Sequence, residues 1–296
     1  MKIDRIKHQD IDKEKYDECI NKSLNGTIYA LSWYLDIASA NWDLLATPDY
    51  SFVMPLPVRK KKGLCYVIQP LACQQLGVFS SSIIDENILN AFLKRIPTFF
   101  CYLHLNSGNI SETLPFRPNY ILNISKSYDL IKQTYNRNTK AQLKKTYQLN
   151  LSFDKNIDIL SALDFAKENS IHYTSKLYEV LSRLIKEASK KDILYIRGVR
   201  NDSGILAISF FFFWNNCFYY LLPVSTHRGK ELQAMRFLLD NFISEFSGQG
   251  FTIDFEGSSA LSVAQFYKSM GGQLTTYPVY EKGHLSSFFN LIKKYI

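Results

Sequence analysis

The stretch FTIDFEGSSALSVAQFYKSMGG, residues 251–272, decides how the second half of this chain folds. A run of β-branched and aromatic residues carries Asp254 and Glu256 into a Gly-Ser turn, which predicts a strand that ends in a turn. An amphipathic helix that closes with FYKSMGG follows at once. A strand that ends in charge and glycine beside a helix is a common place for a site, although such units also form for packing alone.

The segments before this stretch predict helices followed by an antiparallel meander. SKSYDLIKQTY, RNTKAQLKKTYQL, IDILSALDFAKENS and SKLYEVLSRLIKEASKKD have helical spacing. The runs ILYIRGVR, GILAISFFFFW and CFYYLLPVS, separated by the turns DSG and NN, predict three antiparallel strands. After THRGK we expect one long helix, ELQAMRFLLDNFISEFSG, and after residue 272 a strand, QLTTYPVYEK, and a final helix, LSSFFNLIKKY. This order predicts an α+β layer fold.

The first half of the chain reads as strand, two helices, strands, helix and strand. Asp85 caps the helix DENILNAFLKRI and Pro97 stops it. The segment SGNISETLPFRP, residues 107–118, is rich in turn residues, so we place the connection between two domains there. We therefore expect domains at 1–115 and 116–296.

Composition limits the class of protein. The 296 residues have 46% hydrophobic content, which is typical of a globular protein. The net charge of +8 favours a polyanion, a phosphorylated cofactor or an anionic membrane surface as a partner. The most apolar run is broken by Asn215 and Asn216, which makes it too short for a membrane helix. The charged N-terminal segment does not fit a signal peptide. We expect a cytoplasmic protein without an integral membrane segment.

Several site classes are not supported by motifs. The five cysteines form no CxxC pair, and the five histidines have no metal-ligand spacing, so we expect no metal site. The chain contains no GxSxG, HExxH or GxxxxGK[ST] motif.

The order of elements resembles the GNAT N-acyltransferase superfamily, and in particular its Fem-type branch, whose members carry two GNAT-like domains. The segments that carry the resemblance are NRNTKAQLKKTYQLNLSF, the long helix with FTIDFEGS, AQFYKSMGG, and LACQQLGVFS in the first half. The resemblance implies two α+β domains, each with a mixed, mainly antiparallel sheet flanked by helices. It also implies an activated donor, either acyl-CoA or aminoacyl-tRNA, and tRNA as a partner if the donor is aminoacyl-tRNA.

One departure from the GNAT pattern concerns the loop that binds the pyrophosphate of acyl-CoA, roughly R/Q-x-x-G-x-G/A. THRGKELQAMRF contains Arg228, Gly229 and Lys230 but no second glycine. Amide groups at a helix start still favour an anion. Fem-type proteins, which use aminoacyl-tRNA, also lack that loop.

Acyl transfer to an amine requires a polarised carbonyl, a deprotonated amine and a protonated leaving group. We predict Glu256 as base or ammonium anchor, and Asp254 as a cap or structural partner. The resemblance implies that Tyr267 protonates the leaving group. Either Glu256 or Tyr267 could instead be structural.

The remaining candidates are residues for binding the donor or substrate. Besides the three residues of the THRGK turn, we predict Tyr220 on the strand before it. The resemblance implies a phosphate-binding face on one helix, although a charge-rich face is usually just solvated. A polar pair in the first domain could bind a polar substrate. These residues are Arg137 and Lys140, with Lys144 and Lys145, and Gln74 and Gln75.

The sequence therefore predicts transfer of an acyl or aminoacyl group to an amine, a small molecule or a precursor of the cell envelope. The alternative is an inactive GNAT-like binding protein that uses its inter-domain groove for a ligand or partner. A third interpretation, a nucleic-acid-binding module, depends only on the net charge and the basic helix.

Overall fold

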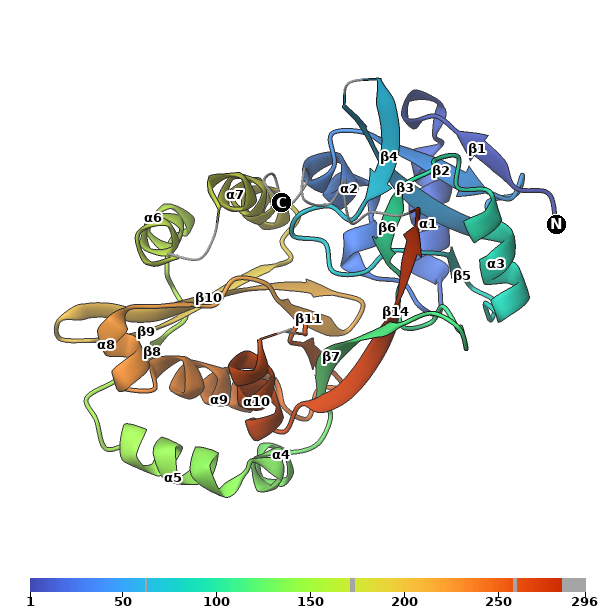
Figure 1. Cartoon of the computed structure of the whole chain (residues 1–296). Coiled ribbons are helices and arrows are strands. Elements are labelled where there is room, and N and C mark those ends of the chain that lie inside the picture. Colours follow the sequence, from blue (N-terminus) through green and yellow to red (C-terminus); the bar gives the residue numbers. More distant parts are fainter. Residues whose placement is uncertain (62, 171–173, 258–259, 284–296) are drawn as a thin grey trace. The chain divides into compact units, whose positions relative to one another are not determined.

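The computed structural model describes residues 1–61, 63–170, 174–257 and 260–283, and its contacts divide the chain into two compact units (Figure 1). Unit 1 contains Met1–Arg117 and the segment that begins at Thr276, and unit 2 contains Pro118–Thr275. The second domain predicted from the sequence, 116–296, differs from unit 2, because it included this last segment. The last segment joins unit 1 because β14 (Gln273–Lys282) pairs antiparallel with β6 (Cys101–His104).

Unit 1 is a mixed sheet with helices packed on it. Neighbouring strands are antiparallel except for the parallel pair β4–β6. Asp85 accepts a hydrogen bond from the backbone N–H of Ile88, which confirms the predicted cap of α3. The strand β2 was not predicted, since all five of its residues are buried and the run does not alternate. The elements are β1 (Asp4–Ile6), β2 (Trp42–Ala46), β3 (Phe52–Lys61), β4 (Leu64–Ile68), β5 (Phe79–Ser80), α1 (Lys13–Lys22), α2 (Ser32–Ala38), α3 (Glu86–Lys94) and the 3-10 turns His8–Asp10 and Ile28–Ala30.

Unit 2 has a sheet in the order β7-β13-β11-β10-β9-β8, with β12 paired to β10. Only the pair β11–β13 is parallel, so the sheet is mixed and mainly antiparallel, as predicted. The strands are β7 (Phe116–Asn123), β8 (Ser152–Asp154), β9 (Leu194–Asn201), β10 (Gly204–Trp214), β11 (Cys217–Tyr220), β12 (Val224–Ser225) and β13 (Thr252–Asp254).

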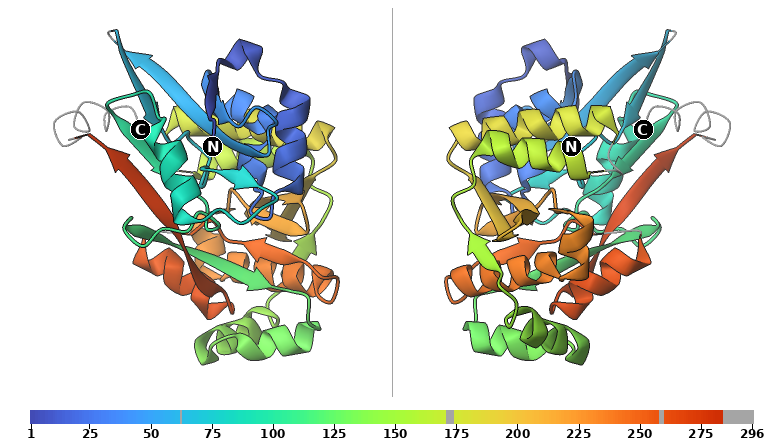
Figure 2. Two further views of the ribbon diagram at one scale, coloured as in Figure 1. Left: turned by 90° about the vertical axis from the view of Figure 1, so that its right-hand side faces the viewer. Right: turned by 90° about the vertical axis from the view of Figure 1, so that its left-hand side faces the viewer.

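Helices cover both faces of the unit 2 sheet (Figures 1 and 2). The pair α6 and α7 lies on one face, α9 and α10 lie on the other, and α5 packs on α9. The stacked rings of Phe211 and Phe242, with centroids 3.8 Å apart, join β10 to α9 in the core. No helix in the described part of the chain is long and apolar enough to cross a membrane. The helices are α4 (Tyr128–Thr134), α5 (Arg137–Thr146), α6 (Ile159–Asn169), α7 (Ser175–Lys190), α8 (His227–Glu231), α9 (Ala234–Phe246) and α10 (Leu261–Ser269).

The predicted long helix over ELQAMRFLLDNFISEFSG corresponds to α9, but α9 begins three residues later than predicted, after the separate short helix α8. Gln233 adopts the left-handed conformation, with φ of 56°, between the end of α8 and the start of α9. Hydrophobic spacing does not reveal a single residue of this kind, since the apolar face continues past it. The predicted final helix lies outside the described residues.

Candidate functional site

Two neighbouring strands of unit 2 separate at the centre of its sheet. Tyr219 and Asp254 are the last paired residues of β11 and β13. Beyond them, the N–H of Leu221 donates to the carbonyl of Phe210 on β10, at 3.1 Å. The N–H of Phe255 donates in the other direction, to the carbonyl of Tyr120 on β7, at 2.9 Å. The two chains therefore follow different neighbours and diverge.

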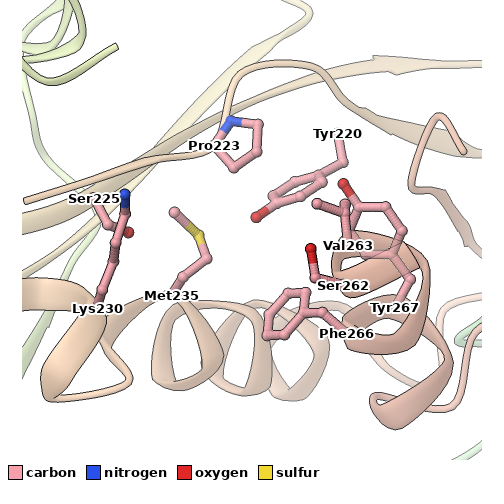
Figure 3. Close-up of a pocket in the computed structure, with 9 residues that line it drawn as sticks. All are labelled: Tyr220, Pro223, Ser225, Lys230, Met235, Ser262, Val263, Phe266 and Tyr267. Atoms are coloured by element: carbon pink, nitrogen blue, oxygen red, sulfur yellow. The ribbon is translucent and has the colours of Figure 1, made fainter. Parts of the chain in front are cut away.

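A pocket with a volume of about 250 Å³ lies beside the diverging part of β11 (Figure 3). Lys230 and Ser225 lie at one end, the α10 side chains lie at the other, and the Tyr220 hydroxyl points between them. The first part of the lining comes from β11 and the segment after it, the second from α8 and α9, and the third from α10. The lining residues are Tyr220, Pro223, Ser225, Lys230, Met235, Ser262, Val263, Phe266 and Tyr267.

Aromatic packing fixes Tyr267 and Tyr220 in the pocket wall. The Tyr267 ring stacks on Phe255, with centroids 4.7 Å apart and planes 7° apart. Tyr220 meets both rings edge-on, at 6.1 Å from Tyr267 and 5.9 Å from Phe255. Both tyrosines are buried, so the rings are held in one orientation. The structure thus brings together two of the predicted site residues.

The three predicted residues of the THRGK turn have different surroundings. Lys230 lines the pocket. Arg228 is exposed and pairs with Glu231 at 2.8 Å, and the exposed His227 approaches the same carboxylate at 3.4 Å. Gly229 is buried against the backbone of β10, where a Cβ atom would clash with the carbonyl group of Leu206.

The two acids of the opening stretch do not both belong to the strand, as a continuous strand would require. The strand ends at Asp254, and Glu256 adopts a φ of 59° in the following turn, where it is half-buried and does not line the pocket. Asp254 is buried and accepts hydrogen bonds from the Glu256 N–H (2.8 Å) and the Asn119 side chain (3.1 Å). These bonds confirm the predicted structural role of Asp254. Burial raises the pKa of Asp254 to about 6, although the two hydrogen bonds oppose the shift.

The predicted basic helix is α5, and its charges lie outside the pocket lining. Arg137, Lys140, Lys144 and Lys145 are all exposed. Lys140 donates to the carbonyl of Gln133 at 2.8 Å. α5 contains no acidic residue, so its surface carries only positive charge.

The predicted glutamine pair belongs to unit 1. Gln75 is buried and donates to the side-chain oxygen of Gln74 at 2.7 Å. It also accepts the backbone N–H of Ser107 at 3.1 Å. Both polar ends of Gln75 are therefore used inside unit 1.

Six of the nine lining residues were not predicted from the sequence. Four α10 residues lie in the lining as two pairs spaced by four, Ser262 with Phe266 and Val263 with Tyr267. This spacing places both pairs on neighbouring parts of one helix face, so the position of Tyr267 alone could have indicated the others. The sequence gave no signal for Met235, because its place in the lining depends on the break between α8 and α9 at Gln233.

The lining can bind a small ligand but offers no metal ligands. No cluster of three or more His, Cys, Asp or Glu side chains suited to a metal ion occurs among the described residues. The pocket combines one ammonium, four hydroxyl groups and apolar side chains. Such a lining suits a short organic group with a polar end.

No family model matches the chain, and no curated protein matches its sequence. The structure of FemX is similar, with a TM-score of 0.67 and 13% identity over 99% of this chain and 100% of that chain. L-PGS from Bacillus licheniformis has a TM-score of 0.52 and 11% identity over 95% of each chain. A tandem GNAT protein from the clavulanic acid biosynthesis pathway has a TM-score of 0.51 and 8% identity over 96% of this chain and 99% of that chain. At these identities the similarity shows the fold alone, and the chain has a tandem GNAT-like fold of the Fem type.

Proposed function

We propose that this chain is an N-acyltransferase that moves an acyl group from an activated donor to an amine, with the pocket of unit 2 as the donor site. One observation carries the proposal: β11 leaves β13 after the pair Tyr219–Asp254, and the pocket lies beside the separated segment. Where two strands separate, the backbone groups that no longer pair across the gap need another partner, and a bound ligand can supply it. The fold that the chain shares with FemX and a tandem GNAT protein supports the proposal.

The proposed reaction exchanges one bond of the acyl carbon. The amine nitrogen attacks the carbonyl carbon of a thioester or ester, a C–N bond forms, and the C–S or C–O bond to the donor breaks. The attacking ammonium loses a proton, and the leaving thiolate or alkoxide gains one. The enzyme must hold these groups in place and keep water away from the carbonyl.

Tyr267 is the proposed proton donor to the leaving group. Its ring is held between Phe255 and Tyr220 in the pocket wall, so its hydroxyl has little freedom to move. Glu256 is the proposed base or ammonium anchor, because it lies two residues after the end of β13. Its left-handed backbone conformation places it in a turn near the point of strand separation.

We propose acyl-CoA or aminoacyl-tRNA as the donor. The exposed basic face of α5 fits a polyanion such as tRNA. Acyl-CoA is the other donor class. AcCoA is a member of it, and the structure of the tandem GNAT protein of the clavulanic acid pathway is described as being without AcCoA. The acceptor is a small-molecule amine or an amine on a precursor of the cell envelope.

One observation favours an inactive binding protein as the second candidate. Thr226 caps α8 by accepting the N–H of Gly229 at 2.9 Å, so this amide is already engaged. Gly229 itself packs against β10. The turn therefore presents less backbone to a pyrophosphate than a loop with two exposed glycines would.

The decisive experiment measures transfer and not binding alone. The purified full-length chain is incubated with acetyl-CoA, succinyl-CoA or aminoacyl-tRNA and a panel of primary amines, and acylated amines are detected by mass spectrometry. We expect transfer to at least one amine. We also expect Tyr267→Phe to lower its rate by about 10²-fold or more, the usual range for a lost general acid. Tyr195→Phe is the matched control, because Tyr195 is a ring-packed tyrosine outside the pocket. Saturable donor binding without any acylated amine would favour the binding protein.

A further inference from the structure

We infer that the pocket selects an acyl group whose far end carries a carboxylate and excludes acyl groups that carry an ammonium. Of the two proposed donor classes, the inference therefore favours acyl-CoA over aminoacyl-tRNA, whose acyl group carries an ammonium. The inference rests on the proposed acyl transfer and names the class of group transferred. It follows from the charges around the pocket, the size of the pocket and the hydrogen bonds already made by the α8 turn.

The pocket contains a positive charge that no acid of the chain neutralises. Lys230 lies at one end, and its neighbours Arg228 and His227 share the carboxylate of Glu231. None of the 27 Asp and Glu residues lines the pocket, and all 27 belong to the described residues. Lys230 is exposed, so water solvates its ammonium, and a ligand carboxylate would replace that water as its partner.

A second positive charge lies behind the pocket wall. The guanidinium carbon of Arg236 is 5.1 Å from the ring centroid of Phe266, whose side chain lines the pocket. Arg236 is buried, and its side chain donates to Ser269 (3.1 Å), to Thr139 and to Gln233, all uncharged. Because buried charges are poorly screened, Arg236 adds positive potential at the pocket.

Asp240, which lies on the same helix as Arg236, does not cancel the positive potential at the pocket. Asp240 lies one turn along α9 from Arg236, and it accepts the hydroxyls of Tyr128 and Tyr147, each at 2.8 Å. These bonds direct its carboxylate toward α4 and α5. An ammonium in the pocket would therefore meet two cations and no facing acid.

The size of the pocket sets the length of the group. A volume of about 250 Å³ corresponds to about eight water molecules, so the ligand has about eight to ten non-hydrogen atoms. Between the two ends, Met235 and Pro223 offer an apolar surface for methylene groups. Ser225 also lines the pocket, so its hydroxyl can donate to the same carboxylate. A short dicarboxylic acid bound to the donor through one end has this shape.

A phosphate fits the same end less well than a carboxylate. A phosphate monoester carries about −1.5 to −2 charges and needs several donors. In the α8 turn, Thr226 already engages the Gly229 N–H, and Glu231 engages Arg228. One ammonium, that of Lys230, matches one carboxylate.

A matched ligand series tests the inference by NMR titration of the full-length chain. Monomethyl glutarate has an ester and a carboxylate, dimethyl glutarate is neutral, methyl 4-aminobutyrate ends in an ammonium, and propyl phosphate carries the alternative anion. For ligands of this size we expect millimolar affinity for monomethyl glutarate. We expect at least about fivefold weaker binding of the other three.

Two variants localise the effect. Lys230→Gln should weaken monomethyl glutarate about tenfold and leave dimethyl glutarate unchanged. Arg183→Gln, which removes an exposed charge of α7 outside the pocket, should change neither. Stronger binding of the ammonium or phosphate ligand, no binding of monomethyl glutarate up to about 10 mM, or equal effects of the two variants would overturn the inference.

Failure here is distinguishable from failure of the proposed function. If the carboxylate binds through Lys230 but no donor yields an acylated amine, the ligand class stands and the transferase proposal fails. If aminoacyl groups are transferred at a rate that Lys230→Gln does not change, the transferase proposal stands and this inference fails.

Discussion

Gly229 separates a ligand-binding explanation of the THRGK turn from a packing explanation. The resemblance to GNAT loops suggests a glycine that lets a phosphate approach the backbone. The structure instead buries Gly229, and an added Cβ would clash with the Leu206 carbonyl oxygen and lie 2.9 Å from its carbon. The same carbonyl accepts the N–H of Thr226 at 2.9 Å, so α8 and β10 are locked together here.

We expect Gly229→Ala to destabilise the protein by about 2 kcal/mol. A methyl group forced into a packed site costs about 1–3 kcal/mol, and displacement of α8 would also weaken the Thr226 cap, worth about 1 kcal/mol. The better helix propensity of alanine returns about 1 kcal/mol. For a chain of this length the melting temperature should fall by about 3 °C.

Urea unfolding of wild type and Gly229→Ala measures the change, with Arg228→Ala as the control on the same helix. Arg228 is exposed, so its replacement should stay within about 0.5 kcal/mol of wild type. A Gly229→Ala variant as stable as wild type, with donor binding lost, would refute the packing explanation and return the glycine to the ligand.

Three further predictions concern buried polar groups of unit 2. The pKa of Asp254 rises from its ordinary value of 3.8 to about 6 in the folded state, so the folded chain binds this proton more tightly and loses stability as pH rises from about 4 to about 6. Asp254→Asn keeps the two acceptor contacts, and its stability relative to wild type, measured by urea unfolding, should rise by about 3 kcal/mol across that range; a constant difference would contradict this. Arg236→Met removes charged hydrogen bonds to Thr139 and Ser269, and we expect a loss of about 2 kcal/mol by urea unfolding, against less than about 0.5 for the exposed Arg183→Met. Tyr147→Phe removes a hydroxyl that donates to buried Asp240 and should cost about 1–2 kcal/mol in thermal unfolding; no difference from Tyr195→Phe would show that this hydrogen bond contributes nothing.

Local signals predicted the elements better than their ends. The cap at Asp85, the meander of β9, β10 and β11, and the helix over residues 261–269 follow from spacing and turn residues that lie within a few positions of each other. The break at Gln233 was missed, because a single left-handed residue leaves the hydrophobic spacing intact. β2 was missed because a strand buried on both faces has no alternation.

The candidate site was predicted in part. Tyr220, Lys230 and Tyr267 were named from the sequence and line one pocket. Glu256 was named on the assumption that its strand stays regular, whereas the strand ends two residues earlier. The side-chain amide group of Gln75 forms its hydrogen bonds within unit 1. One of them comes from the backbone N–H of Ser107, more than thirty residues away in the sequence.

The sequence by itself determined the class and order of the elements, since helix and strand periods, caps and turns are properties of neighbouring residues. Tertiary structure alone decided which side chains share the pocket and which charges have partners. Lys230 and Arg228 are two residues apart on one helix, yet one faces the pocket and the other faces Glu231. The difference arises because a helix turns about 100° at each residue, and only the packing of α8 on β10 fixes which direction leads to the pocket.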